Sequence, residues 1–487
     1  MRNAMNYKMI CRIIAPLLII EAGFLLPAIG IGIHYGETNA VEAIFYSQSL
    51  MILLACILYL FSKQALPGFR AKEGLVTTGM TWIIMSMLGC LPFYISREIP
   101  HYIDALFEVV SGFTTTGSSI LTRVESMSRC LLYWRSFTHW LGGMGVLVFL
   151  LAVLPLTHGY EGFTIHILRA ESPGPSVGKI VPRMKETAVI LYVIYIGLTI
   201  LDIVFLCFAH MPLFDAVCIA FGTAGTGGFG VLNHSMADYT ASAQTVTTIF
   251  MLLFGVNFTV FYMLFLGKLK MVFRDEELRV YLFIIFLSIL GVAWNIRGLY
   301  SSFREILHQA SFSVATIIST SGFAIADFDQ WPSFAKTILL CLMVCGACAG
   351  STGGGIKVAR LLLLGKSLRR SIHLNMHPSE VRCVRFNENA VDEKTIRNVA
   401  AYLSAYLAIV VISFLFLSLD GFSLETNLSA VLATINNIGP GFAMVGPSGN
   451  FSLFSDLSKL VMIFDMLAGR LEIFPILILF GRSTWRK

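Results

Sequence analysis

The chain has 487 residues, of which 56% are hydrophobic and only 13% are charged. This balance, with a mean hydropathy of +0.76, excludes an ordinary soluble protein and indicates an integral membrane protein. The formal net charge of +6 does not indicate nucleic-acid binding, because the basic residues stand beside the apolar runs instead of forming one patch. The ten cysteines lie mostly within those runs, which favours buried free thiols over disulfides.

Ten apolar runs reach the length of about 20 residues that a helix needs to cross a bilayer. They lie near 10–34, 42–62, 75–95, 132–155, 187–209, 244–267, 278–297, 336–356, 397–419 and 457–480. The first run is long and lacks a small-residue cleavage site, so we expect no cleavable signal peptide. The sequence therefore predicts an all-α membrane protein with ten transmembrane helices.

Four shorter segments between the later runs follow one plan, in which a short apolar helix ends in a loop of small residues. The four loops align when four glycines are set in register: Gly117, Gly228, Gly322 and Gly439. Thirteen positions upstream stand the residues that we expect to start the short helices: Asp104, Asp215, Gln309 and Thr426. Asp and Thr suit an N-cap because a side-chain oxygen accepts from the free N–H groups of the first turn.

This plan predicts four helix–pore-loop–helix repeats around one central pore. The expected domains are an N-terminal two-helix hairpin at 1–66, pore repeat 1 at 67–160, pore repeat 2 at 161–270, pore repeat 3 with an intramembrane loop at 271–372, and pore repeat 4 at 373–487. Loops of this kind at membrane depth are tolerated only where they are buried in protein or line a water-filled cavity.

The distribution of basic residues predicts the orientation. Most of the 35 Lys and Arg residues fall in the segments that are cytoplasmic if the N-terminus is cytoplasmic, and cytoplasmic segments of membrane proteins carry that excess. We therefore expect both termini in the cytoplasm and all four pore loops entering from the outer face. The two longer cytoplasmic links, 156–186 and 357–397, are too short for a catalytic domain; the first contains Ser172-Pro173-Gly174-Pro175 and should be irregular.

The four loops have the chemistry of an ion filter. A ring of backbone carbonyls replaces the hydration shell of a potassium or sodium ion without adding full charges, and glycine tolerates the positive φ that aims successive carbonyls in one direction. Close helix packing is the alternative role for such glycines, but four in register favour a filter. The residues expected to line the ion path are Thr114, Thr115, Thr116, Gly117, Thr226, Gly227, Gly228, Thr320, Ser321, Gly322, Asn437, Ile438 and Gly439.

Six strings carry a family resemblance, and the match runs over essentially the whole chain. They are Gly112-Phe113-Thr114-Thr115-Thr116-Gly117, Gly227-Gly228-Phe229, Ser321-Gly322-Phe323, Asn436-Asn437-Ile438-Gly439-Pro440-Gly441, Gly350-Ser351-Thr352-Gly353-Gly354-Gly355-Ile356-Lys357 and Gly469-Arg470-Leu471-Glu472. The chain resembles the Trk/Ktr/HKT superfamily of potassium transporters, and within it the membrane subunit of the bacterial Trk system. All four filter positions are Gly, so the resemblance implies potassium as the favoured ion.

The eighth apolar run is interrupted by glycines. From Lys336 to Ala347 it offers about 12 residues, or ~18 Å of helix, against a hydrocarbon core of ~30 Å. The following Gly350–Gly355 segment would cost a continuous helix roughly 1 kcal/mol per glycine. A phosphate-binding loop is excluded because Ile356 separates Gly355 from Lys357 and no Ser or Thr follows. A passive kink remains the alternative to the pore-obstructing loop that the resemblance implies.

Arg470 stands deep in the tenth run, where an arginine is costly and normally faces a water-filled path or a partner. A structural ion pair with another helix is the alternative to a pore-facing charge, which could set a cation barrier or hold the loop near Lys357. The residues expected to form the gate are therefore Gly350, Gly353, Gly354, Gly355, Lys357 and Arg470.

The expected function is channel-like potassium uptake across the bacterial inner membrane. A sodium- or proton-coupled cation symporter of the same superfamily is the alternative. An enzyme is not expected, because the chain has no HExxH, GxSxG or aspartate pair. The resemblance implies a homodimer in the lipid bilayer, bound on its cytoplasmic side to a ring of nucleotide-binding regulatory subunits. No cofactor is expected besides the transported K⁺, and no nucleic-acid partner.

Overall fold

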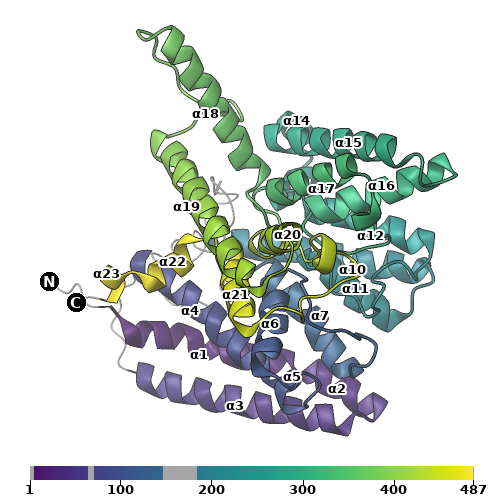
Figure 1. Ribbon diagram of the computed structural model, residues 1–487. Coiled ribbons are helices and arrows are strands. Elements are labelled where there is room, and N and C mark those ends of the chain that lie inside the picture. The colour runs from purple at the N-terminus through teal and green to yellow at the C-terminus, as the bar shows by residue number, and fades with distance from the viewer. Residues whose placement is uncertain (1–4, 64–70, 146–183, 486–487) are drawn as a thin grey trace.

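The computed structural model describes residues 5–63, 71–145 and 184–485, which are almost entirely helical. The predicted link 156–186, the end of the fourth predicted span and the boundaries at 66 and 160 lie outside the described residues or at their edge. The first helices form a long antiparallel layer in which α1 and α3 lie side by side (Figure 1). The bounds of this layer are α1 Tyr7–Phe24, α2 Leu26–Tyr35 and α3 Thr38–Ser62.

The remaining helices follow the predicted order of long and short elements. Around the first loop lie α4 Ala71–Gly89, α5 Leu91–Ile95, α6 Tyr102–Phe113 and α7 Arg129–Gly143. Around the second lie α10 Met184–Phe208, α11 Leu213–Gly225, α12 Ala241–Phe254, α13 Phe258–Phe265 and α14 Leu269–Arg274. Around the third lie α15 Glu276–Ile296, α16 Phe303–Ile318, η1 Phe328–Gln330 and α17 Ser333–Cys345.

The C-terminal part begins with α18 Val358–Met376, which extends away from the body of the protein (Figure 1). A two-stranded antiparallel hairpin, β1 Arg385–Phe386 and β2 Asn389–Ala390, follows it. The last elements are α19 Glu393–Leu417, η2 Ser418–Asp420, α20 Leu424–Ile435, η3 Ala443–Val445, α21 Asp456–Arg470, α22 Phe474–Phe480 and α23 Arg482–Trp485.

In the described part of the chain, six helices are long and apolar enough to cross a membrane, and a seventh is added if α12 and α13 count as one span bent by 92°. Their outer faces expose large apolar side chains, such as Phe45 on α3 and Phe286 on α15. A row of such side chains suits contact with lipid and would be a liability in water. The chain is therefore a multi-pass membrane protein, with fewer uninterrupted spans than the ten apolar runs suggested.

Two of the predicted spans are broken. The eighth ends at Cys345, where Gly346 adopts a positive φ of 70°. The tenth was expected to be continuous, but α21 ends at Arg470, and Glu472 and Ile473 have positive φ. Pro475 explains part of this break, since a proline cannot continue a helix but fits the first turn of a new one.

The predicted N-caps of the short helices were wrong. The caps are His101, Pro212, Ser302 and Ser423. Asp104 and Asp215 instead lie in the first turn, where a carboxylate also stabilises the positive end of the helix dipole. The third short helix is longer than its counterparts and begins six residues before Gln309, at Phe303.

Candidate functional site

Each of the four short helices ends in the same backbone motif. In the first, the N–H of Thr115 donates to the carbonyl of Gly112 (3.0 Å) and the N–H of Thr116 donates to that of Ser111 (2.8 Å). The equivalent pairs are Thr226–Thr223 with Gly227–Gly222, Thr320–Ile317 with Ser321–Thr316, and Asn437–Thr434 with Ile438–Ala433. This is the Schellman motif, in which one residue beyond the helix takes left-handed dihedrals.

The left-handed residue of each motif is not a glycine. Its φ is 55° at Thr115, 57° at Thr226, 61° at Thr320 and 54° at Asn437. For a β-branched residue this conformation costs about 1–2 kcal/mol, and it persists only where the surrounding structure fixes it. Three threonines strained in the same way mark these loops as sites where backbone geometry is maintained against local preference.

Two residues further on, each loop has a second positive φ, this time at the predicted glycine. The values are 82° at Gly117, 79° at Gly228, 77° at Gly322 and 101° at Gly439, and the residue between the two positive-φ positions is not itself at positive φ. Alternation of right-handed and left-handed dihedrals brings successive peptide carbonyls to one side of the chain, whereas a β-strand turns them to opposite sides.

The four glycines also close a ring. A Cβ atom built on Gly117 would overlap the carbonyl oxygen of Gly227 in the next loop. The same relation joins Gly228 to the carbonyl of Ser321, Gly322 to that of Ile438, and Gly439 to that of Thr116. Glycine Cα atoms and carbonyl oxygens therefore alternate around one axis, in chain order. We call this arrangement the four-loop ring.

Side chains join the last loop of the ring to the first. The hydroxyl of Ser118 donates to the carbonyl of Gly439 (2.9 Å), and the amide of Asn437 donates to Thr116 Oγ1 (2.9 Å). The residues that precede the glycines in all four loops are buried, whereas Gly117, Gly228 and Gly322 are partly exposed. They face a cavity of about 530 Å³ that all four glycines line. The sequence-predicted filter residues are thus brought together at the floor of one cavity.

A buried ion pair supports the ring from behind, and sequence reasoning missed it. Arg135 Nε on α7 lies 2.6 Å from Glu108 Oε1 on α6, and both side chains are buried. Glu108 also accepts from the N–H of Ile120, while Arg135 donates to the carbonyl of Gly230 and lies 3.5 Å from the centre of the Phe229 ring. The pair thus connects the segments that follow the first and second glycines.

His139 is a second residue that the sequence did not mark. Its Nδ1 lies 2.7 Å from the carbonyl of Gly112, and its ring packs on Phe229. A Cβ on Gly227 would meet the imidazole ring directly. The histidine therefore fills the space behind the second loop, which its two consecutive glycines would otherwise leave unsupported. Only its distance along the helix from Arg135, one turn, could have suggested this.

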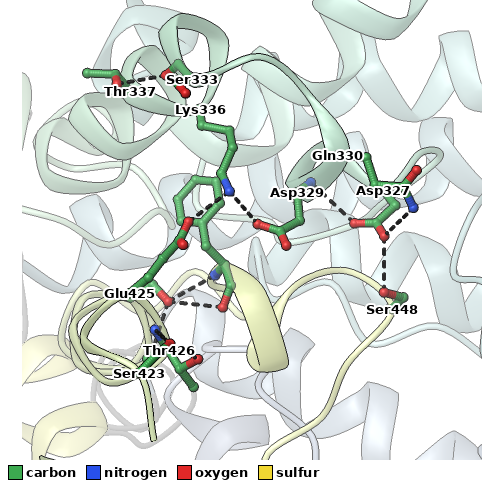
Figure 2. A network of polar contacts seen from close by, with 12 residues as sticks. Asp327, Asp329, Gln330, Ser333, Lys336, Thr337, Ser423, Glu425, Thr426 and Ser448 are labelled. Carbon is green, nitrogen blue, oxygen red and sulfur yellow. Dashed lines mark hydrogen bonds and ion pairs between the residues drawn. The ribbon is translucent and has the colours of Figure 1, made fainter.

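A polar network near the same cavity links the third and fourth repeats (Figure 2). Lys336 Nζ, on α17, lies between Asp329 Oδ1 (2.8 Å) and Glu425 Oε1 (2.7 Å). Asp327 accepts from Gln330 and, across the boundary between the repeats, from Ser448 (3.2 Å). Asp327 and Ser448 line the cavity, so this network shapes its wall.

The Gly-rich loop, residues 346–357 between α17 and α18, lies against the opposite side of the ring. The N–H of Gly354 donates to Thr320 Oγ1 (2.6 Å), and the N–H of Gly355 donates to the carbonyl of Asn436 (3.1 Å). A Cβ on Gly354 would overlap that same carbonyl. The predicted gate glycines therefore contact the third and fourth predicted filter loops directly, and only glycine fits at this approach.

The other end of the Gly-rich loop contacts the break between α12 and α13. The carbonyl of Gly350 accepts from the N–H of Phe258 (3.1 Å), and Thr352 Oγ1 donates to the carbonyl of Phe254 (3.3 Å). Lys357 is buried at the end of the loop with a positive φ of 79°, and its ammonium donates back to the carbonyl of Gly353. The unwound backbone is thus fixed by specific polar contacts.

Arg470, the last residue of α21, connects the Gly-rich loop to α7. Its Nη1 donates to the carbonyl of Thr352 (2.7 Å), and its Nη2 donates to the carbonyls of Gly142 and Gly143 (2.5 Å each). Nearby Glu472 pairs with Arg360 of α18. The planar guanidinium fork suits such simultaneous contacts with separate segments. Arg470 and Lys357 thus lie on the same loop, as the sequence predicted, through main-chain carbonyls.

The apolar helices and the four-loop ring define a multi-pass membrane protein of the transporter class. A family model described as TrkH, a cation transport protein, matches residues 41–296 and 298–486. The chain therefore belongs to the TrkH family of cation transport proteins, and it is a transporter, not an enzyme.

Relatives match over nearly the full length. The chain is 34% identical to the Trk system potassium uptake protein TrkH of Salmonella typhimurium, covering 99% of this chain and 100% of that one. It is 34% identical to the Trk system potassium uptake protein TrkG of Escherichia coli, covering 95% of both. The crystal structure of the potassium transporter TrkH from Vibrio parahaemolyticus matches with a TM-score of 0.89 at 30% identity, covering 99% and 100% of the two chains.

Proposed function

We propose that this chain mediates channel-like potassium uptake, with the four-loop ring as its backbone-carbonyl filter. The ring of alternating glycine Cα atoms and carbonyl oxygens is the observation that carries the proposal. Partial negative charge at the C-terminal ends of the four short helices favours a cation at the centre. Rings of carbonyls replace the hydration shell of K⁺, and the relatives' names, potassium uptake proteins, support the choice of ion.

The Gly-rich loop and Arg470 form the proposed gate. The loop lies on the side of the ring opposite the cavity, so an ion that passed the ring would next meet Gly354 and Gly355. In this proposal Arg470 acts in two ways, as a positive charge near the ion path and as the side chain that holds Thr352 in place. The gate opens when these contacts are exchanged for others.

The membrane arrangement is part of the proposal. We infer four repeats with the predicted boundaries, ten membrane crossings in which the bent and broken helices count as spans, and both termini in the cytoplasm of a bacterial cell. The cavity then faces the outside and α18 with the β1–β2 hairpin faces the cytoplasm. We also infer a homodimer in the inner membrane and a cytosolic nucleotide-binding regulatory partner that acts on this cytoplasmic surface.

A coupled sodium or proton symporter of the same superfamily is the alternative. It is less favoured because the four predicted filter loops carry no carboxylate that could bind and release a coupling ion. Rubidium uptake into cells that lack other potassium systems separates the two functions. A channel-like protein should follow the potassium gradient when the sodium and proton gradients are collapsed, and a symporter should stop.

Substitution of Gly117 by Ser tests the filter. The new side chain would meet the carbonyl of Gly227, and its φ of 82° strains any L-residue, so we expect a reduced preference for potassium over sodium. Gly230→Ser is the matched control, because Gly230 lines the same cavity but has room for a Cβ, with its nearest neighbour at 3.5 Å. An unchanged permeability ratio in Gly117→Ser, with normal amounts of folded protein, would remove Gly117 from the filter.

A further inference from the structure

One buried carboxylate holds both ends of the Gly-rich loop. Glu277, in the first turn of α15, is 4% exposed. Its Oε1 accepts from the N–H of Ala349 (2.6 Å), just before the glycines, and from the N–H of Ala359 (3.1 Å), just after them. Ala359 lies in the first turn of α18, whose N-terminus has no side-chain cap of its own. One oxygen atom thus closes the loop and also caps the helix that follows it.

The residues before Glu277 connect it to the cytoplasmic hairpin. Asn387 forms the turn between β1 and β2 together with Glu388, and both have positive φ, which is typical of a two-residue hairpin turn. The amide of Asn387 donates to Asp275 Oδ2 (2.8 Å), and its carbonyl oxygen accepts from the N–H of Glu276 (2.9 Å). This one side chain therefore fixes the hairpin to the start of α15.

Lys366 of α18 adds a second connection between the same parts. Its ammonium pairs with Glu276 and also donates to the carbonyl of Arg385 in β1 (2.8 Å). The hairpin, α18 and the start of α15 are thus joined by polar contacts over three consecutive acidic residues, Asp275 to Glu277. A shift of the hairpin cannot leave the position of Glu277 unchanged unless these contacts break.

We propose that Glu277 is a positioning residue that keeps the Gly-rich loop closed, and that Asn387 sets its position from the cytoplasmic side. The proposal rests on the gating role proposed above for that loop. In physical terms, the hairpin is the element on which a cytoplasmic signal acts, and the Glu277 oxygen is the contact through which the signal reaches the backbone beneath the ring. Release of either Ala349 or Ala359 frees one end of the loop.

Basal rubidium flux through the full-length protein, without any regulatory partner, tests the role of Glu277. Glu277→Ala removes both hydrogen bonds, and we expect flux per protein molecule to rise about tenfold, the factor that corresponds to 1.4 kcal/mol. Glu277→Gln should restore low flux, because its amide oxygen can accept both bonds. Glu21→Ala is the matched control, since Glu21 is another fully buried carboxylate, on α1 against Gly89 and away from the loop.

Labelling of Cys348 gives a second measurement. This thiol is buried next to Ala349, so opening of the loop should make it reactive to a water-soluble thiol reagent. Cys218, which is buried in α11, should stay protected. Reaction of both thiols in Glu277→Ala would indicate general unfolding and would overturn a specific role for Glu277 in positioning the loop.

Asn387→Gly tests the cytoplasmic connection without touching a buried group. Glycine keeps the turn backbone and removes the side chain that binds Asp275 and Glu276, so basal flux should rise by about two- to fivefold. Glu388→Gly, the adjacent turn position, is the control, because its exposed side chain makes only a long 3.9 Å contact with Arg274. Equal flux in the two turn variants would overturn the role of Asn387.

Deletion of Gly353–Gly355 separates failure of this inference from failure of the gate itself. If the deletion raises basal flux and Glu277→Ala, normally folded, does not, then the loop is a gate but Glu277 does not position it. If neither variant raises basal flux, the gating proposal is wrong and the inference falls with it. Increased flux in both, with low flux in Glu277→Gln, supports both proposals.

Discussion

Replacement of Arg470 by alanine should increase cation flux. The guanidinium contacts three carbonyls, of which one, Thr352, belongs to the Gly-rich loop and two, Gly142 and Gly143, belong to the end of α7. A hydrogen bond to a charged group contributes about 1.5–3 kcal/mol. Loss of the single bond to the loop would therefore shift the equilibrium between closed and displaced loop by roughly 10- to 150-fold.

The charge of Arg470 acts in the same direction. A unit charge repels a cation at 4 Å by about 4 kcal/mol if the effective dielectric constant is near 20, and the three bound carbonyl dipoles reduce that repulsion. Arg470→Lys separates the two effects, because it keeps the charge but cannot form the planar bridge between two segments. We expect the lysine variant to leak nearly as much as alanine, since the bridge is what the structure displays.

Flux must be measured per molecule of folded protein in the membrane, because removal of a buried charged group also costs stability. Lys459→Met on the same helix is a suitable control, since it removes another buried cation, the partner of Asp104, away from the loop. The ratio of potassium to sodium flux should stay near the wild-type value in Arg470→Ala. A poorly expressed Arg470→Ala protein with normal flux per molecule would refute the reasoning.

Two further predictions concern contacts on either side of the ring. Thr320→Val keeps the β-branched shape but leaves the N–H of Gly354 without its acceptor, so basal rubidium flux should rise several-fold with little change in the amount of folded protein. Burial raises the pKa of Asp329, but the hydrogen bond and charge of Lys336 and the N–H of Ala443 lower it further, for a net shift below the ordinary 3.8. Its stabilising contribution is therefore complete above that pH and lost below it, by less than about 1 kcal/mol. Melting temperatures should fall less between pH 5 and 3 in Asp329→Asn than in the wild type.

The register of the four loops was predictable because it depends on local chemistry. Gly117 and its three counterparts adopt positive φ and face a neighbouring carbonyl at close range, and both conditions demand glycine. The same holds for Gly354 beneath Asn436. The start of the short helices was less predictable, since Asp104 stabilises the helix either as a cap or from the first turn.

The supporting groups could not be predicted because their partners are distant in the sequence. Glu108 and Arg135 stand on different helices, and neither differs in composition from an ordinary surface residue. The break after Arg470 likewise depends on tertiary contacts, since only Pro475 signals it locally. Glu277 was hidden in the same way, because it appears to be an ordinary first-turn acid until Ala349 and Ala359 are brought to it.

The Gly-rich loop is held by several modest contacts rather than one strong one, and this decides how a proposed gate of this kind can work. Thr320, Asn436, Glu277 and Arg470 each bind a different point of the loop. To move a two-state equilibrium from 1:99 to 99:1 requires about 5.5 kcal/mol, which is the sum of two to four such bonds. Any single substitution should therefore raise basal flux without opening the gate fully. A regulator that displaces the loop must break several contacts together, and a connection from the cytoplasmic hairpin through α15 reaches the one residue that holds both ends of the loop.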